Sequence, residues 1–364
     1  MAINYAEKYS KTIDERFTQA SITERAINKD FDFVGVQTVK VYSVPTVAMG
    51  DYKRQGAQRY GVPEELQNTV QEMTMGRDRA FTFTVDKGNE DETSGALNAG
   101  KALSRQINEV IVPEVDAYRL AKIVHGAGHV EIGDYKGNIK AYERILDAQA
   151  ALDDALVPRT GRILYVTSAL RKAIMMDDNF IKPSEMAQKM LINGQFGEVD
   201  GLPIILAPAG YLPSGVSMLL THPQATTAPY KLAEYKTHMD PPGINGVLVE
   251  GRNYYDAFIL NNKRKCIYVL RSELVHLNVS AAAGSASGKT VITVTGDKDE
   301  AGQMGALCYK SGASQSEAQL GDDVSAWTEL PQGGEIAATS GHKIAVALRD
   351  GKGRAIGSGI VTAI

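Results

Sequence analysis

The sequence predicts an α+β protein that ends in an all-β domain, and three observations lead to this fold class. Apolar residues recur at helical spacing over 95–124, with Pro113 inside the run. The stretch that follows, to about residue 207, mixes helical and strand-like patterns. After Val275 the chain consists of short strand-like runs punctuated by Gly, Asp and Ser. These patterns divide the chain into 1–277 and 278–364.

The residues ahead of the long helix predict extended elements. Residues 3–20 have the mixed charges of a surface helix, and 31–41 alternates like a strand. Residues 44–60 lack apolar periodicity, which predicts a mobile excursion. The runs 68–75 and 79–85 alternate with a period of two on either side of Gly76-Arg77-Asp78, a pattern typical of a β-hairpin. Since a lone hairpin is marginal in water, we expect it to pack on a helix or a neighbouring chain.

The middle of the chain predicts helices and strands in alternation. A kink is expected in the helix over 95–124, because an interior proline removes a hydrogen bond and costs about 3 kcal/mol. The later elements are a helix over 138–156, a strand over 162–167, a helix over 168–176 and a strand over 202–207.

Residues 240–262 combine packing residues with no obvious nucleophile. Pro241-Pro242-Gly243 predicts a turn, and 247–249 and 257–260 predict buried strands. Between these strands we expect a polar and aromatic cluster, formed by Arg252, Asn253, Tyr254, Tyr255 and Asp256. Arg252 and Asp256 could form an ion pair, either within one subunit or between two.

The C-terminal residues predict an immunoglobulin-like sandwich. Its strands are expected over 290–295, 306–310, 335–338, 343–348 and 355–363, with a hairpin turn at Asp350-Gly351. The small residues of SAAAGSASGK predict a flexible linker that precedes the first of these strands.

Composition and charge exclude several classes of protein. The 364 residues, 43% of them hydrophobic, can bury a substantial core in two or more domains. The formal net charge is -4, so there is no basic excess for wrapping nucleic acid or coating a membrane. No run approaches the roughly 20 apolar residues of a membrane span, and we expect synthesis in a cytosol. Cys266 and Cys308 lie in apolar runs, which favours reduced packing residues over a disulfide or zinc.

Four segments occur in a fixed order: RAFTFTVDKGNEDET (79–93), EVIVPEVDAYRLAKI (109–123), FGEVDGLPIILAP (196–208) and DPPGINGVLVEGRNYYDAFILNN (240–262). Together they resemble the major capsid proteins of tailed bacteriophages with the HK97 fold. The resemblance extends over about 1–277. It implies an N-arm (about 1–30), an extended loop and hairpin (about 45–85), a spine helix (about 95–124) and an axial domain (about 135–262), beside a peripheral domain.

By this resemblance the chain is a structural protein without a cofactor or metal, and not an enzyme. It would assemble into pentamers and hexamers of an icosahedral head, enclosing double-stranded DNA without sequence-specific binding. Since no long helical segment precedes the arm, a separate scaffolding protein is expected, or assembly through the arms themselves, together with a portal protein. Assembly would take place in the bacterial host cytoplasm, and the product would be the virion. The alternative is the shell of an encapsulin-type bacterial nanocompartment.

Residues 278–364 would then project outward, for reinforcement or for attachment to a surface, including glycans. The candidates for assembly or packing are Arg252, Tyr254, Tyr255, Asp256, Met73 and Met75. Methionines suit an interface that repacks, although a place in the core or on the surface is the simpler interpretation. Lys53 is conceivable as a crosslinking donor, but a solvated lysine explains it more simply.

Other motifs have simpler explanations than a reaction site. AGSASGKT matches a loose phosphate-loop pattern, but Lys289 and Thr290 lead into a strand instead of a helix. His125, His129 and Glu131 lack a further His or Cys for a metal site. The paired acids 153–154 and 177–178 fit helix ends and turns, and Trp327 fits a core or edge position in the β domain.

Overall fold

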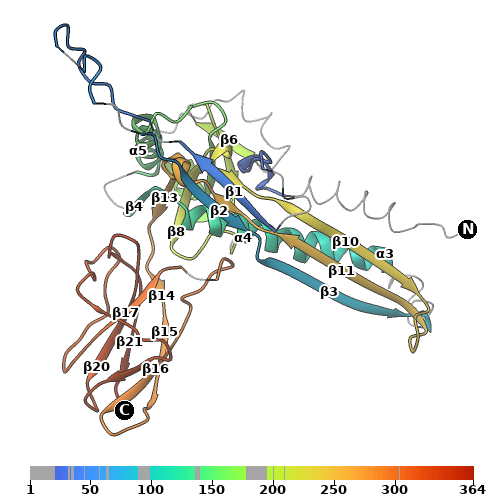
Figure 1. Cartoon of the computed structure of the whole chain (residues 1–364). Coiled ribbons are helices and arrows are strands. Elements are labelled where there is room, and N and C mark those ends of the chain that lie inside the picture. The colour runs from blue at the N-terminus through green and yellow to red at the C-terminus, as the bar shows by residue number, and fades with distance from the viewer. Residues whose placement is uncertain are drawn as a thin grey trace, which may run out of the picture.

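The computed structural model describes residues 21–31, 33, 37–44, 46–56, 58–62, 65–88, 99–135, 140–177, 195–199, 201–208, 210–302 and 304–364. Figure 1 shows an elongated body, a C-terminal lobe set apart from it and a thin excursion at one end. The helix predicted over 3–20 lies outside the described residues, as do parts of the strand predicted over 31–41. Within the described ranges, no helix is both long enough and apolar enough to cross a membrane.

The centre of the body is a six-stranded sheet in the order β4-β13-β8-β5-β7-β6. Its strands are β4 (His129–Ile132), β5 (Ile163–Val166), β6 (Gln195–Val199), β7 (Leu202–Leu206), β8 (Val216–Thr221) and β13 (Ile267–Arg271). Helices α5 (Ala141–Asp154) and α6 (Ser168–Met176) pack on one face, and α4 (Val112–His125) packs on the other. Alternate residues of β5 therefore enter two different apolar clusters, Leu164 on one side and Tyr165 on the other. The helices and strands predicted over 138–207 are confirmed.

The spine helix predicted over 95–124 is present in three parts. They are α3 (Ala99–Gln106), a π-helical segment (Ile107–Ile111) and α4 (Val112–His125). The π-helical segment ends two residues before Pro113, so Pro113 falls in the first turn of α4. A backbone N–H at that position needs no helical partner, so its absence from proline costs little. Residues 95–98 lie outside the described residues.

A second, three-stranded sheet lies along the spine helix (Figure 1). We call it the ribbon; it consists of β3 (Arg77–Asp86), β10 (Tyr230–Met239) and β11 (Gly246–Tyr255), in the order β10-β11-β3. Its inner face packs on α3 and the π segment through residues such as Tyr235 and Val249. Residues 240–262 were expected in the axial domain, and 246–255 of them form the ribbon's long central strand, β11. Most of the predicted polar cluster, 252–255, lies within β11, so its side chains alternate between the two faces of the ribbon.

The predicted hairpin between 68–75 and 79–85 is wrong in its pairing. Strand β2 (Thr69–Thr74) pairs with β1 (Thr38–Ser43), and β3 pairs with β11. Alternation identifies a strand and its buried face but not its partner, so both strands were found and wrongly joined. The β1–β2 pair carries the excursion of residues 44–68, whose described side chains are exposed.

The C-terminal lobe contains two sheets, β14-β21-β20-β17-β18 and β15-β16-β19, around one apolar cluster. Their strands are β14 (Val275–His276), β15 (Asn278–Ala283), β16 (Lys289–Thr295), β17 (Ala306–Gly312), β18 (Thr328–Glu329), β19 (Glu335–Ala337), β20 (Lys343–Arg349) and β21 (Ala355–Thr362). The predicted linker is wrong over 280–283, because its first small residues belong to β15, which pairs with β16. The hairpin predicted at Asp350-Gly351 is confirmed by the pairing of β20 with β21.

Short elements connect these parts. β9 (Thr226–Thr227) pairs with β12 (Phe258–Ile259), so the second strand predicted in 257–260 is only two residues long. Three 3₁₀ turns occupy Glu24–Ala26, Pro223–Ala225 and Asn261–Cys266.

Candidate functional site

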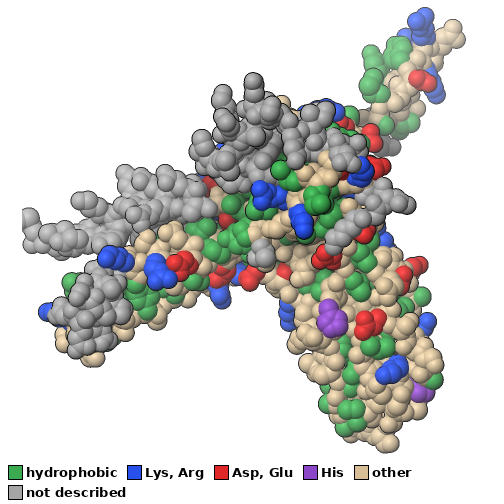
Figure 2. Space-filling view, turned by 180° about the vertical axis from the view of Figure 1, so that it is seen from behind, with side chains coloured by type: hydrophobic (Ala, Val, Ile, Leu, Met, Phe, Trp, Pro, Cys, Tyr) green, Lys and Arg blue, Asp and Glu red, His purple; other side chains and the backbone are tan. Residues whose placement is uncertain are grey.

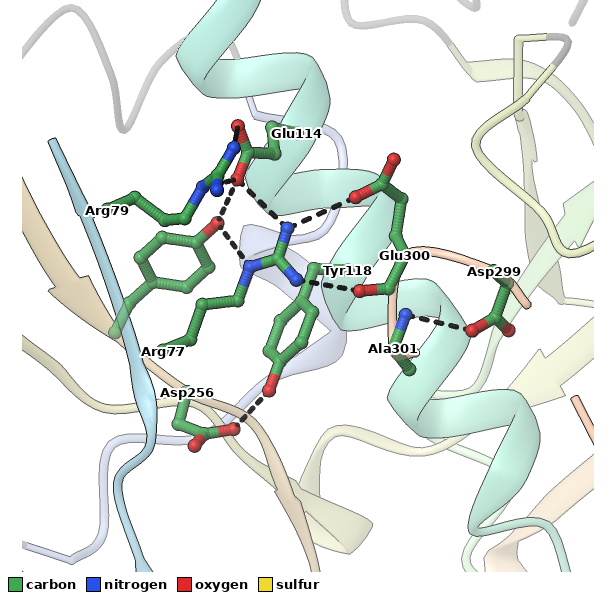
Figure 3. A network of polar contacts seen from close by, with 9 residues as sticks. Arg77, Arg79, Glu114, Tyr118, Asp256, Asp299, Glu300 and Ala301 are labelled. Atoms are coloured by element: carbon green, nitrogen blue, oxygen red, sulfur yellow. Dashed lines mark hydrogen bonds and ion pairs between the residues drawn. The ribbon is translucent and has the colours of Figure 1, made fainter. Parts of the chain in front are cut away.

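Arg77, the first residue of β3, lies where the ribbon, the spine helix and the C-terminal lobe meet (Figure 3). Its Nη2 lies 2.9 Å from Glu114 Oε1 on α4 and 3.1 Å from Glu300 Oε2 in the lobe. Nη1 donates to the Glu300 carbonyl oxygen at 2.7 Å, and Nε donates to Tyr255 Oη at 3.1 Å. The guanidinium carbon also lies 4.4 Å from the centroid of the Tyr118 ring. One cation therefore joins three parts of the chain.

Glu114 holds a second arginine at this junction. Arg79 Nε donates to Glu114 Oε1 at 2.8 Å. Burial acts to raise the pKa of Glu114, but hydrogen bonds from Arg79 and Arg77 outweigh it and hold that pKa below its usual range. Burial likewise acts to lower the pKa of Arg77, and its bonds to Tyr255 and Glu114 raise that pKa overall. The junction is therefore an ionised carboxylate between two guanidinium groups.

Asp256 anchors the other end of the junction as a buried carboxylate, 4% exposed. Tyr118 Oη donates to its Oδ1 at 2.6 Å, and the Ala257 amide donates to the same oxygen at 2.8 Å. The Gly76 amide donates to Oδ2 at 2.9 Å. Burial and the bond to Asp256 raise the pKa of Tyr118, which keeps the phenol a neutral donor. With three donors the carboxylate is satisfied, and it holds the start of β3 to the end of β11 and the helix.

Aromatic rings fill the space between these polar groups. Tyr255 stacks on Tyr230 with ring centroids 5.7 Å apart and meets Tyr118 edge-on at 5.6 Å. Asn253 Oδ1 accepts hydrogen bonds from Tyr230 and Tyr235 at 2.5 and 2.9 Å. Burial raises the pKa of Tyr255 to about 12. This end of the ribbon is held by oriented rings and hydrogen bonds, an arrangement suited to rigidity.

Comparisons with known proteins identify the fold. No family model and no curated protein matches the sequence. A solved structure titled for Mycobacterium phage Che8 matches with a TM-score of 0.56 at 16% identity, over 69% of this chain and 90% of that one. The asymmetric unit of the bacteriophage PhiM1 mature capsid matches with a TM-score of 0.52 at 11% identity, over 69% of this chain and 87% of that one. The capsid structure of the cyanophage P-SCSP1u matches with a TM-score of 0.51 at 10% identity, over 70% of this chain and 89% of that one.

The chain has the HK97-type fold of phage capsid proteins. This confirms the fold that the sequence resemblance implies. In each case the match covers most of the capsid structure but only about 70% of this chain, so a substantial part of the chain lies outside the capsid fold as those structures have it.

Within one chain of this HK97-type body, Arg252 and Asp256 do not form the ion pair that was one of the two predicted alternatives. Arg252 Nη2 lies 2.6 Å from Asp78 Oδ2 on the outer, solvent-facing side of the ribbon, and Asp256 faces the helix. Residues four apart are neighbours on a helix, but in a strand they are separated by about 13 Å at 3.3 Å per residue. The partner of Arg252 comes instead from the adjacent strand β3. Asp78 lies directly opposite Tyr254, two residues along β11 from Arg252, so Arg252 and Asp78 are diagonal neighbours on one face of the sheet.

The other candidates are packing residues in the HK97-type body. Tyr254 Oη donates to the Met75 carbonyl oxygen at 3.0 Å. Met73 and Met75 are fully buried in a small cluster with Phe33 and Leu260. A role for these residues in assembly is therefore a proposal that goes beyond their packing.

Two surfaces of the HK97-type body are exposed in the part of the chain that the structure describes. The first is the excursion and its base, where large apolar side chains are exposed, namely Tyr42, Val44, Val47, Met49, Tyr52, Tyr60, Val62, Leu66 and Val70. Figure 2 shows hydrophobic atoms gathered along this projection, with charged groups between them. The second is the outer face of the ribbon, where paired charges alternate, namely Arg252 with Asp78, His238 with Glu250, and Lys236 with Glu234.

Sequence reasoning missed the anchor of the chain's N-terminal segment. Asp116 on α4 is 1% exposed and accepts hydrogen bonds from Ser21 Oγ and Thr23 Oγ1 at 2.5 Å and from the Ile22 amide at 2.9 Å. Arg119 Nη1 donates to Thr23 Oγ1 at 3.2 Å. An acid inside the apolar run VPEVDAYRLAKI was the available signal, because a carboxylate at a buried helical position needs a partner.

Arg77 and its partners were missed for a different reason. Arg77 was assigned to a turn, and Glu300 lies more than two hundred residues away in the sequence. Glu114 and Tyr118 are four apart on α4, so they share a helix face, and that spacing was a usable signal.

The remaining motifs occupy structural positions. Lys289 begins β16, and its Nζ lies 3.3 Å from Glu335 Oε2, so no helix N-terminus follows the glycine-containing turn. Asp153 pairs with Arg159 and Arg162 near the end of α5. Asp177 accepts a hydrogen bond from the Tyr142 amide, and Asp178 lies outside the described residues.

The histidine pair and the cysteines are also in structural positions. His125 Nε2 lies 2.8 Å from Asp299 Oδ2, whereas His129 and Glu131 belong to β4. In the part of the chain that the structure describes, no group of three or more His, Cys, Asp or Glu side chains could hold a metal. Cys266 and Cys308 are free thiols, and Trp327 packs beside Cys308 in the lobe.

Proposed function

We propose that this chain is a structural major capsid protein, not an enzyme, and that it assembles into pentamers and hexamers of an icosahedral phage head around double-stranded DNA. The observation that carries the proposal is the backbone match to phage capsid structures over most of their length. The ribbon's outer face and the exposed apolar excursion support it, because the described residues leave both surfaces exposed.

The excursion is the element most suited to cross to a neighbouring copy. Met49 is 100% exposed and Tyr60 is 93% exposed, yet both carry large apolar surfaces. Burying such side chains on a neighbour yields about 1.5–3 kcal/mol each, and a shell repeats the contact in every subunit. The ribbon's outer charges would set the register of neighbours more than they add affinity.

The C-terminal lobe serves as an immunoglobulin-like sandwich that projects outward in this proposal, for reinforcement or attachment to a surface such as a glycan. A separate scaffolding protein and a portal protein would be the partners of assembly in the bacterial cytoplasm. The two packed sheets of the lobe support the sandwich part of the proposal. If the chain forms a phage head, the particles should contain DNA and no enzyme cargo. If it forms a nanocompartment, they should contain a cargo enzyme instead.

Electron microscopy of the full chain, expressed with the scaffolding protein from its own genome, tests the proposal. We expect closed shells, with surface protrusions that vanish when the chain is ended after Ser272, ahead of β14. Met49→Glu with Tyr60→Glu should abolish shells and leave a folded chain, because charges cannot be buried in an apolar contact. Lys53→Gln in the same excursion is the matched control and should assemble normally. Folded chains that stay monomeric throughout would contradict the proposal.

A further inference from the structure

The C-terminal lobe touches the body at more places than its covalent link. The chain enters the lobe after β13, and a single link of this kind lets a domain rotate. Beside the link, however, the lobe contacts β3 through Arg77, α4 through His125 and β4 through Val130 and Ile132. The lobe is therefore held to the body by side-chain contacts with three elements as well as by the covalent link.

The first tie is made by the loop that joins β16 to β17. Its Glu300 offers Arg77 both a carboxylate oxygen and the backbone carbonyl oxygen, at 3.1 and 2.7 Å. The loop presents them in a fixed shape, because the Ala301 amide donates to Asp299 Oδ1 at 2.8 Å and the Gly302 amide donates to the Asp299 carbonyl oxygen at 2.9 Å. Figure 3 shows the loop pointing at the guanidinium. A preformed loop loses little freedom on docking.

The second tie joins the same loop to the end of the spine helix. His125 Nε2 lies 2.8 Å from Asp299 Oδ2, and the Asp299 side chain is only 7% exposed.

The third tie lies beside the covalent link. Arg354 Nη2 donates to the Val130 carbonyl oxygen at 3.1 Å, and Ile132 packs into the lobe's own apolar cluster.

We infer that the lobe is locked to the body within one chain, with residues 297–302 docked on Arg77 and His125 as a latch. The lobe then projects at a fixed angle and braces the helix–ribbon junction, since Arg77 also holds Glu114 and Tyr255. This holds for the unassembled chain and does not depend on shell formation, so it can fail or succeed independently of the capsid role.

Spin-label distances between the body and the lobe test the latch on the unassembled full chain. Labels go on cysteines introduced at Lys172 of α6 and Lys310 of β17, both exposed, in a parent with Cys266→Ser and Cys308→Ala. The parent should give one narrow distance distribution. Glu300→Lys, alone and with His125→Ala, should broaden that distribution at least about twofold, because it places a cation against Arg77.

Glu329→Lys is the matched control. It makes the same charge change in the same lobe, but Glu329 pairs with Arg349 inside the lobe and is 73% exposed. This variant should keep the narrow distribution. A broad distribution in the parent would overturn the latch, and so would a narrow one in the Glu300→Lys, His125→Ala double variant with circular dichroism equal to that of the parent. Loss of the parental dichroism in that variant but not in the control would also count against it, since the latch joins two parts that each have their own core.

Discussion

The six-stranded sheet and the ribbon are built from similar lengths of chain but are stabilised differently. The sheet is covered on both faces, by α5 and α6 on one side and α4 on the other, and its strand β5 is buried at all four positions. Among the residues that the structure describes, the ribbon is covered on its inner face only. Its outer face carries exposed ion pairs, and its base is held by Asp256, Tyr118 and Arg77.

This difference separates folding from assembly. A sheet with two covered faces has buried its apolar side chains within one chain, so substitutions there should change the stability of the unassembled chain. A ribbon with one open face keeps a surface that a neighbour can use, and needs a directional polar network to stay rigid until then. The following predictions test this division, in order of expected effect.

Leu220→Ala in β8 should give the largest loss of stability. Leu220 is fully buried in the sheet's cluster, and such truncations cost about 2–5 kcal/mol through lost burial and the remaining cavity. Leu248→Ala, on the outer face of the ribbon, is the matched control and should cost less than about 1 kcal/mol. Urea unfolding of the unassembled chain measures both. Equal losses would remove the distinction between the two regions.

Asp256→Ala should destabilise the ribbon by about 1–3 kcal/mol, because Tyr118 Oη and the amides of Gly76 and Ala257 lose their acceptor. Asp256→Asn retains an acceptor oxygen and should cost less. Hydrogen exchange should show the loss in β3 and β11 ahead of β5 and β8. A loss spread evenly over both sheets would argue against a local network.

Alkaline pH should weaken the ribbon through Tyr255. Burial raises its pKa to about 12 from 10.0, so above pH 10 the unfolded chain ionises while the folded chain holds its proton. The contribution to stability is therefore complete below pH 10 and falls as pH rises to about 12. Tyr255→Phe should flatten this part of the stability curve, with Tyr42→Phe, at an exposed position in β1, as control. Identical slopes in both variants would count against the assignment.

Arg252→Ala should have the smallest effect on the isolated chain. Arg252 and Asp78 are 56% and 40% exposed, and exposed pairs contribute about 0–1 kcal/mol. If the outer face meets a neighbour, the same change should slow shell growth measured by light scattering. Lys236→Ala, on the same face, should behave alike. A stability loss as large as that of Asp256→Ala would place Arg252 in the junction network.

The sequence was sufficient for local structure and for the fold, but not for contacts distant along the chain. Helical spacing located the spine helix and alternation located β2 and β3, because both depend only on which face is buried. The apolar run 247–249 located only the first part of β11, whose remaining residues were expected between two strands. The partner of β2 was assigned wrongly, since β1 lies on the far side of a long excursion. Arg252 and Asp256 were both singled out, yet their partners, Asp78 and Tyr118, come from elements that alternation and spacing cannot place opposite them.

The central claim is that the open ribbon and the excursion are completed by neighbouring copies in a closed shell. A cryo-electron microscopy reconstruction of the full chain assembled with its scaffolding protein tests it most directly. We predict an icosahedral shell in which the apolar side chains of 44–68 and the ribbon's outer face lie against adjacent subunits. A reconstruction in which both surfaces face solvent, or a folded chain that forms no shell, would contradict it.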